Sequence, residues 1–499
     1  MSLFLGAASA TADGCFVIRV IDEATGRGVP LVELRTVNEV SYWTDSGGVV
    51  AFDEPGLMGK RVFFYVSSHG YEFPKDGFGY RGTALDVTPG GTATLKIRRL
   101  NIAERLYRVT GEGPYRDTVL AGLQPPVKQS LINASVLGQD SVQNAIYHGR
   151  LYWFWGDTSR PAYPLGNFHM PGATSRLPAD GGLDPAVGVD LEYFVDQNGF
   201  AKETCHMPGD GPTWATGFTV LRDPDGRERM FAAYAKIKGP MDTYQRGIVE
   251  WNDETQQFDK RFEFPIDAPA APYGHPFVDG GYVYFADPYP VTRTLADPAH
   301  FLDLSTYECF TCVDEKGEVG RGVDGKVAWS WKRGAKAMSQ EDEAKLIKEG
   351  KLQAEDARFQ LRDVETGKPV LAHRGSVCWN DYRKRWVMIA TQQFGTSFLG
   401  EVWYAEADSP TGPWTVARKI VTHDKYSFYN PKQHPYFDQE GGRIIYFEGT
   451  YTKTFSGNEH ATPRYDYNQV MYRLDLGDPR LAVVDAGVVG GASAPTVRG

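Results

Sequence analysis

Two aspartates flank an aromatic-rich hairpin near residue 150. Asp140 precedes a strand-like run, and Asp157 follows the aromatic stretch 152–155 within Gly-Asp-Thr. The strands of a hairpin run antiparallel, so the start of the first lies beside the end of the second. Two carboxyl groups held together disfavour each other's charge, which raises the pKa of one of them, as general acid–base chemistry requires. We therefore predict that Asp140 and Asp157 form an acid–base pair.

The same hairpin pattern occurs five times after residue 130. Each copy has a strand, a polar turn and an aromatic-rich strand, at 140–157, 214–236, 273–287, 373–392 and 429–448. A further strand follows each copy, and five units of about four antiparallel strands are typical of a propeller. The sequence thus predicts an all-β fold with a five-bladed β-propeller over residues 130–484. The alternative is a string of unrelated hairpins.

One helix is expected to interrupt the propeller, in an insertion near 334–356. Ser339 is the predicted N-cap, acidic residues follow in the first turn, and Gly350 ends the helix, which gives a span of 340–349.

The other hairpins supply further candidates for the same funnel. In a propeller the first strand of each blade lines the axis, so equivalent strand ends share one face. This places together Trp214 with Lys236, His275 with Asp287, Arg374 with Gln392, and His434 with Glu448. Glu448 or Asp287 is the alternative proton donor. The remaining side chains, together with Asn430, are expected to bind hydroxyl or carboxylate groups, and Trp214 to stack on a ring.

Glycosidic hydrolysis uses two carboxyl groups, one protonated and one ionised. The five hairpins resemble the five-bladed propeller glycoside hydrolases (arabinanase, xylosidase and invertase relatives). Those enzymes carry an Asp, an Asp and a Glu in blades one to three. This chain has Asp140 first, but Trp214-Ala-Thr-Gly217 and Gly274-His-Pro276 in the next two places.

A closer resemblance is to the propeller family that includes endo-D-arabinanases, whose two catalytic Asp residues flank the first hairpin. Asp140 and Gly156-Asp157-Thr158 match that layout. The resemblance implies a glycoside hydrolase acting on a poly- or oligosaccharide. No cofactor is required, and an acidic funnel is compatible with a structural Ca²⁺ on the axis. Retaining and inverting outcomes both stay open.

Residues 1–100 are predicted to form a small β-sandwich, because strand-like runs alternate with Gly, Asp and Pro turns. Their motifs resemble the carboxypeptidase-regulatory-like (transthyretin-like) domain: V-x-D-x-x-T-G-x-G-V-P-L-V, then T-D-S-G-G, then Y-V-S-S-H-G-Y. Such modules are usually appendages, and His69 and Asp76 are interpreted as loop residues. Residues 101–129 are predicted to be a linker, and 485–499 a disordered tail.

The formal net charge of −10 argues against a nucleic-acid partner. No run of 18 apolar residues is present, so the sequence predicts no membrane span. The type of protein suggests a secreted or periplasmic location, with the signal peptide missing from this sequence. The oligomeric state is not predicted.

Five cysteines form no disulfide framework, and Cys309 and Cys312 are interpreted as wall residues rather than a metal pair. Glu203, Cys205 and His206 resemble a metal cluster. In a strand, however, His206 points away from the other two, so no metal site is predicted.

Two alternatives to hydrolysis by carboxylates stay open. One is a non-catalytic glycan-binding propeller that uses Trp214 and tyrosines. The other is a metal-dependent hydrolase or lyase with His275 and His434 as ligands.

Overall fold

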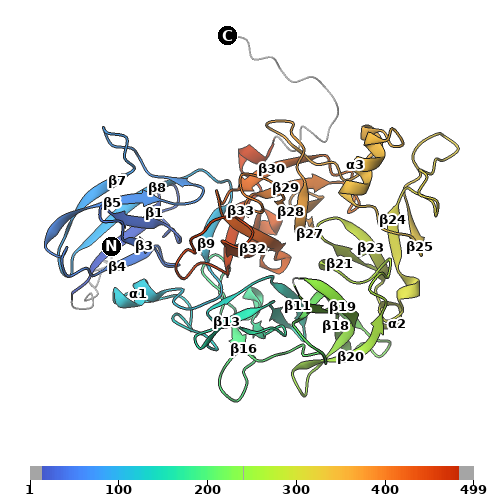
Figure 1. Cartoon of the computed structure of the whole chain (residues 1–499), viewed down its shortest axis with the longest axis horizontal. Coiled ribbons are helices and arrows are strands. Elements are labelled where there is room, and N and C mark those ends of the chain that lie inside the picture. Colours follow the sequence, from blue (N-terminus) through green and yellow to red (C-terminus); the bar gives the residue numbers. More distant parts are fainter. Residues whose placement is uncertain (1–13, 240, 483–499) are drawn as a thin grey trace, which may run out of the picture.

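The computed structural model describes residues 14–239 and 241–482, and its main body is a five-bladed β-propeller (Figure 1). The five inner strands are β11 (Gln143–Tyr147), β17 (Thr213–Arg222), β21 (His275–Asp279), β27 (Ala372–Asn380) and β31 (Ser427–Gln433). Consecutive inner strands contact each other around the ring. Lys432 on β31 closes the ring by donating from Nζ to the Asn144 carbonyl of β11 at 2.9 Å.

Each inner strand begins an antiparallel sheet that runs outward. Blade one continues with β12 (Arg150–Phe154), β15 (Gly172–Ser175) and β16 (Glu192–Tyr193). Blade two continues with β18 (Glu228–Lys238), β19 (Asp242–Asn252) and β20 (Gln257–Phe264). Blade three continues with β22 (Tyr282–Ala286), β23 (Pro290–Leu295), β24 (Glu308–Thr311) and β25 (Ser330–Arg333). Blade four continues with β28 (Arg385–Gln392), β29 (Val402–Ala407), β30 (Val416–Val421) and β26 (Arg362–Asp363).

Blade five is completed by a strand from far upstream in the sequence. After β32 (Ile444–Thr452) and β33 (Asn468–Asp475), its outer strand is β9 (Glu104–Arg108). This strand lies within 101–129, which was predicted as a linker with its path along the propeller left open. The same stretch contains the short helix α1 (Arg116–Leu120), which lies against the N-terminal domain. Pairing β9 with β33 joins the two ends of the propeller and holds the ring closed.

Polar turns and apolar strands explain the blades. In the turn of blade two, Asp223 Oδ1 accepts from the N–H groups of Asp225 and Arg227, and Gly226 takes the left-handed backbone that suits glycine. Neighbouring blades pack through aromatic rings. Phe154 stacks on Phe218 with ring centroids 4.7 Å apart, so burial holds blade one against blade two.

Three strands outside the blades form a small separate sheet. These are β10 (Gly138–Gln139), β13 (Thr158–Arg160) and β14 (Tyr163–Asn167). The predicted helix is α3 (Gln340–Lys348), and the Ser339 hydroxyl accepts from the Asp342 N–H in a capping box. A further short helix is α2 (Pro298–Phe301). Among the described residues no helix has the length and apolarity needed to cross a membrane.

The N-terminal domain is a sandwich of two four-stranded sheets (blue in Figure 1). One sheet contains β4 (Val49–Phe52), β1 (Phe16–Asp22), β8 (Thr92–Arg99) and β6 (Tyr71–Glu72). The other contains β3 (Ser41–Trp43), β2 (Glu33–Thr36), β5 (Lys60–Ser67) and β7 (Gly82–Val87). Apolar residues from both sheets form one core between them. The predicted tail at 485–499 and the first residues of the chain lie outside the described residues.

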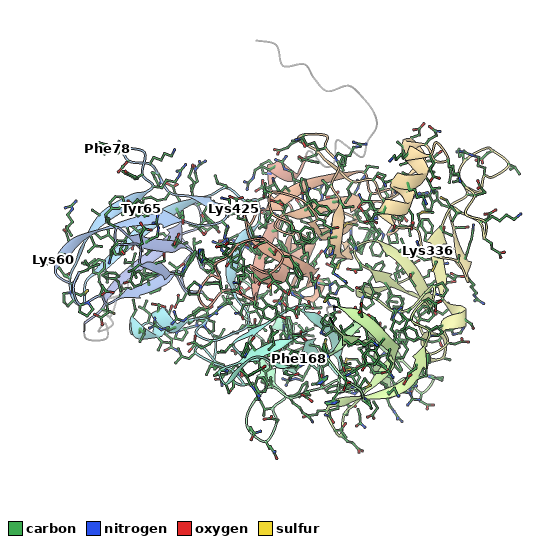
Figure 2. All side chains as sticks on the ribbon, in the orientation of Figure 1. Lys60, Tyr65, Phe78, Phe168, Lys336 and Lys425 are labelled. Atoms are coloured by element: carbon green, nitrogen blue, oxygen red, sulfur yellow. The ribbon has the colours of Figure 1, made fainter. Side chains whose placement is uncertain are left out.

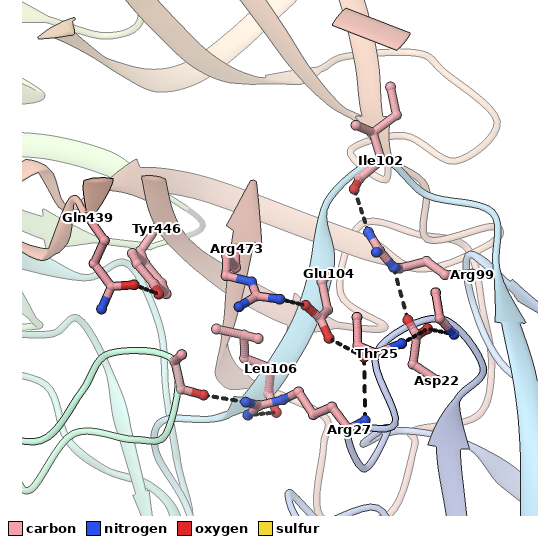
Figure 3. Close-up of polar contacts among 12 residues, drawn as sticks. Asp22, Thr25, Arg27, Arg99, Ile102, Glu104, Leu106, Gln439, Tyr446 and Arg473 are labelled. Atoms are coloured by element: carbon pink, nitrogen blue, oxygen red, sulfur yellow. Dashed lines mark hydrogen bonds and ion pairs between the residues drawn. The ribbon is translucent and has the colours of Figure 1, made fainter. Parts of the chain in front are cut away.

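The sandwich is fastened to blade five by charged and polar contacts (Figure 3). Glu104 on β9 forms an ion pair with Arg473 of β33 and accepts from the Thr25 hydroxyl of the sandwich at 3.1 Å. Arg27 donates to the Leu106 carbonyl at 3.1 Å. His69, predicted only as a loop residue, lies 3.0 Å from the Tyr451 hydroxyl of β32. Strand β9 therefore pairs with blade five and also bonds the sandwich.

Arg105 on β9 is the buried centre of this interface. Its side chain is enclosed, and the guanidinium donates to the Pro30 and His69 carbonyls at 3.1 Å each and to the Ser68 hydroxyl. Replacing it with alanine would leave buried carbonyls without donors, so we expect Arg105→Ala to lower the free energy of unfolding by roughly 3–5 kcal/mol. Urea unfolding would measure this loss.

The matched control for Arg105 is Arg61→Ala. Arg61 lies 3.7 Å from Asp86, and both side chains are about 70% exposed. We expect this variant to change stability by less than about 0.5 kcal/mol. Equal losses for the two variants would show that the buried arginine does not hold the interface.

Candidate active site

The first hairpin brings Asp140 and Asp157 together. Asp140 lies just before β11 and Asp157 follows β12. The Gly156 N–H donates to the Asp140 carbonyl at 2.8 Å, and the Asp157 N–H donates to the Asp140 carboxylate. A Cβ at position 156 would lie 2.1 Å from Asp140 Oδ1, so the close approach depends on glycine there.

Asp140 is surrounded by hydrogen-bond donors. The Tyr429 hydroxyl donates to Asp140 Oδ2 at 2.7 Å, and Tyr467 and Ser141 also bond to this carboxyl group. Burial raises the pKa of Asp140, while these donors oppose the rise because they stabilise the carboxylate. The pKa of Asp140 stays above its ordinary value, and the charge of Asp140 in turn raises the pKa of its neighbour Asp157.

Asp157 has a different environment. The Trp214 indole N–H donates to Asp157 Oδ1 at 2.9 Å. Burial, followed by the charge of Asp140, raises the pKa of Asp157 to about 7, and the bond from Trp214 only partly opposes this. Asp157 can therefore hold a proton near neutral pH.

Unusual backbone geometry positions the groups around the pair. Ser141, Asn430 and Tyr467 all have φ between 50° and 60°, which few non-glycine residues adopt. Asn430 Nδ2 donates to Ser141 Oγ at 2.7 Å, and the Ser141 N–H donates to Thr450 Oγ1 at 3.0 Å. These bonds link blade five to blade one at the acid pair.

Asp287 and Arg374 form an ion pair between blades three and four. Arg374 Nη1 lies 2.9 Å from Asp287 Oδ2, and its guanidinium lies 5.1 Å from the centre of the Tyr273 ring. Burial raises the pKa of Asp287, and the charge of Arg374 opposes this. Because the guanidinium and the Gly375 N–H already bond this carboxyl group, Asp287 is less suited than Asp157 to be the proton donor.

The predicted pair of His434 and Glu448 lies deeper in the propeller than expected. Tyr429, beside Asp140, marks the funnel end of β31, whereas Glu448 pairs with Lys432 three residues further along. Both Glu448 and His434 are fully buried, with His434 Nε2 3.7 Å from Glu448 Oε1. The two side chains are neighbours as predicted, but they lie away from the start of the strand, because β31 begins at Ser427 and is bulged between Tyr429 and Lys432.

Three other predicted residues differ in their surroundings. Lys236 pairs with Thr213 rather than Trp214, and its buried ammonium donates to the Met207 and Gly211 carbonyls, so it does not line the funnel. His275 is also buried, and burial lowers its pKa well below the usual value. Gln392 accepts from the Trp403 indole at 2.9 Å.

Sequence reasoning missed three aromatic residues of the site. Tyr429 and Tyr467 bond Asp140, and Phe455, about half exposed, packs against Tyr429 with ring centroids 5.9 Å apart. Tyr429 begins the fifth hairpin, so its position could have indicated the site. Tyr467 lies between β32 and β33, outside the repeated pattern, and no sequence signal marks it.

No family model matches the chain, and no curated protein does either. Solved structures with a similar arrangement include an exo-1,5-α-L-arabinanase from a bovine ruminal metagenomic library, at 8% identity and a TM-score of 0.35, covering 68% of this chain and 93% of that one. A GH43_1 enzyme from Xanthomonas citri complexed with xylotriose has 13% identity and a TM-score of 0.33, covering 68% and 87%. An exo-β-1,3-galactanase from Phanerochaete chrysosporium has 9% identity and a TM-score of 0.37, covering 75% and 65%. At these scores the functional assignment rests on the chain's own geometry.

Proposed function

We propose that the chain is a glycoside hydrolase that cleaves a poly- or oligosaccharide with Asp140 and Asp157. The observation that carries this proposal is that two adjoining carboxyl groups differ in the surroundings that set their protonation. Burial raises the pKa of both groups, but several donors bond Asp140 and favour its ionised form, and the charge of Asp140 helps to raise the pKa of Asp157 to about 7. Glycoside hydrolysis needs such a pair, one carboxyl protonated and the other ionised.

In this mechanism Asp157 is the general acid. It gives its proton to the glycosidic oxygen as the bond to the leaving sugar breaks. The Trp214 indole holds the carboxyl group in place by its bond to Oδ1. The developing positive charge on the sugar ring is stabilised by the Asp140 carboxylate, which acts on the sugar or on an attacking water.

Substrate contacts are proposed around this pair. Phe455 offers an exposed ring beside Tyr429 on which a sugar can stack, because its flat apolar face matches the C–H face of a sugar. Arg374, whose side chain is 37% exposed, and Asn430 are the proposed hydrogen-bond partners for sugar hydroxyls or carboxylates. Trp214 uses its N–H to hold Asp157, so its main role is positioning.

A glycan panel tests this function. The native chain is incubated with plant, algal and bacterial-envelope polysaccharides, and released reducing ends are measured. We expect at least one substrate to be cleaved by the native chain and left intact by the double variant Asp140→Asn/Asp157→Asn.

Two outcomes of the panel would contradict the proposal. Full activity of the double variant would remove the acid pair from the mechanism. Saturable binding without product, unchanged in the double variant, would instead show a non-catalytic glycan-binding propeller.

A metal-dependent reaction at His275 and His434 is less well supported. Among residues 14–239 and 241–482, these histidines do not join the funnel acids in a set of three donors within mutual reach. For the N-terminal sandwich we propose the role of a carboxypeptidase-regulatory-like appendage that braces blade five through β9. A secreted or periplasmic location is also a proposal, consistent with an extracellular polysaccharide substrate.

A further inference from the structure

A second cluster of chemically active side chains, separate from the acid pair, comes from the loops that join blades one and two. His169, Glu203 and His206 each offer a donor atom within 4.8 Å of the others. His206 Nδ1 lies 2.7 Å from Glu203 Oε2, and the two imidazole rings are 4.2 Å apart between centroids. Phe168, labelled in Figure 2, is the residue before His169 and lies where the two blades meet. The mechanism proposed above does not use these residues.

The sequence prediction excluded a metal here because it assumed a continuous strand. The structure shows only an isolated bridge between Pro171 and Glu203, so the alternation of side chains is not maintained through position 206. Cys205 is buried and turned into the apolar core, whereas His206 returns to Glu203. The third donor, His169, comes from a segment more than thirty positions upstream, which local spacing could not reveal.

The backbone holds the three donors in place. The Cys205 N–H donates to the His169 carbonyl at 3.0 Å, which fixes the two segments side by side. The Thr213 hydroxyl lies 3.2 Å from His169 Nδ1 and can accept its N–H, which leaves Nε2 as the ligand atom. Such an outer partner is typical of metal-bound histidine.

We propose that His169, Glu203 and His206 bind one divalent transition-metal ion, with Zn²⁺ the best match. Two imidazole nitrogens and one carboxylate suit Zn²⁺, whereas Ca²⁺ and Mg²⁺ prefer oxygen ligands throughout. Bonds of about 2.0–2.1 Å in a tetrahedron separate donors by about 3.4 Å. The observed donor separations include 2.7 Å between His206 Nδ1 and Glu203 Oε2 and extend to no more than 4.8 Å, a range that contains this value. The half-exposed His206 and Glu203 leave the fourth position open to solvent.

Metal binding at this site would brace the funnel wall. Residues 168–171 lie beside the start of β17, where the Thr213 N–H donates to the Phe168 carbonyl at 2.9 Å and the Thr213 hydroxyl contacts His169. The adjoining Trp214 holds Asp157. The ion would tie residues 168–171 to residues 203–206, and its binding energy would add to the stability of the folded chain. The inference concerns these residues alone and does not depend on the proposed hydrolase activity.

The test is a calorimetric titration of the chelator-treated full chain with ZnCl₂, accompanied by melting curves with and without Zn²⁺. We expect one equivalent to bind and Tm to rise. Glu203→Gln and His206→Ala should weaken binding by at least about 10- to 100-fold and remove the Tm rise. Without metal, both variants should melt like the native chain, because the two side chains are about half exposed.

His300→Ala is the matched control. His300 pairs with Asp297 at 2.6 Å at the same spacing of three residues, but has no second histidine in a donor set among the described residues. We expect this variant to bind Zn²⁺ like the native chain. No Zn²⁺ binding by the native chain, unchanged binding in the Glu203 and His206 variants, or equal binding of Ca²⁺ would each overturn the proposal.

Discussion

Replacing Asp157 with asparagine is expected to lower kcat on the natural substrate by about 10²- to 10⁴-fold, the usual contribution of a general acid. Because its pKa is raised to about 7, the Asp157 carboxyl group can hold and donate a proton near neutral pH, and an asparagine amide cannot. The amide oxygen can still accept from the Trp214 indole, so the fold around the site should persist. Initial rates on the substrate identified in the glycan panel would measure the loss.

Comparing substrates with different leaving groups distinguishes the roles of Asp140 and Asp157. An aryl glycoside with an acidic phenol needs little protonation, so Asp157→Asn should retain much of its activity on it. Asp140→Asn should lose activity on both substrates, because Asp140 stabilises the sugar cation or activates water whatever the leaving group. Identical losses for both variants on both substrates would contradict the assignment.

The pH dependence of activity is a second test of Asp157 as the general acid. Because Asp157 must be protonated, kcat/KM of the native chain should fall as pH rises through about 7. The variant Asp157→Asn should lack this limb. Asp279→Asn, an exposed carboxylate at the far turn of blade three, is the control and should keep the native profile and rate.

Much of the fold could be predicted because each blade carries its own signal. An apolar second strand and a polar turn recur in every hairpin, and local sequence is enough to form them. Strand β9 could not be predicted in the same way. Its five residues pair with β33 at the other end of the chain, and only the closed ring defines that partner.

The acid pair could be predicted because the two aspartates are linked by one short hairpin. The partners predicted for residues in the other hairpins were less accurate, because the register of some strands differs from a regular hairpin. Residues 372–375 and 429–432 contain β-bulges, which add residues to one strand and displace every partner beyond them. The backbone partner of Glu448 is thus Lys432, deep in the propeller, although the Glu448 side chain lies beside His434. Bulges leave little trace in the sequence, so residues from different blades could be matched only approximately.

Asp157 is also expected to reduce the stability of the folded chain at neutral and alkaline pH. Burial raises its pKa from an ordinary 3.8 to about 7. Between these values the folded chain holds a proton that the unfolded chain has lost, so the free energy of unfolding falls as pH rises from about 4 to 7. Above pH 7 the buried charge is present in full, and its cost is at most about 4 kcal/mol.

Asp157→Asn removes that cost because the amide does not ionise. We expect the variant to match the native chain near pH 4 and to exceed its stability by about 2–4 kcal/mol at pH 8, as measured by urea unfolding across this range. Asp279→Asn should show no such pH-dependent gain. A variant that is destabilised equally at every pH would show that Asp157 serves the fold. A gain in stability confined to high pH, together with lost activity, would show that the site retains a carboxyl group that destabilises the fold but is needed for catalysis.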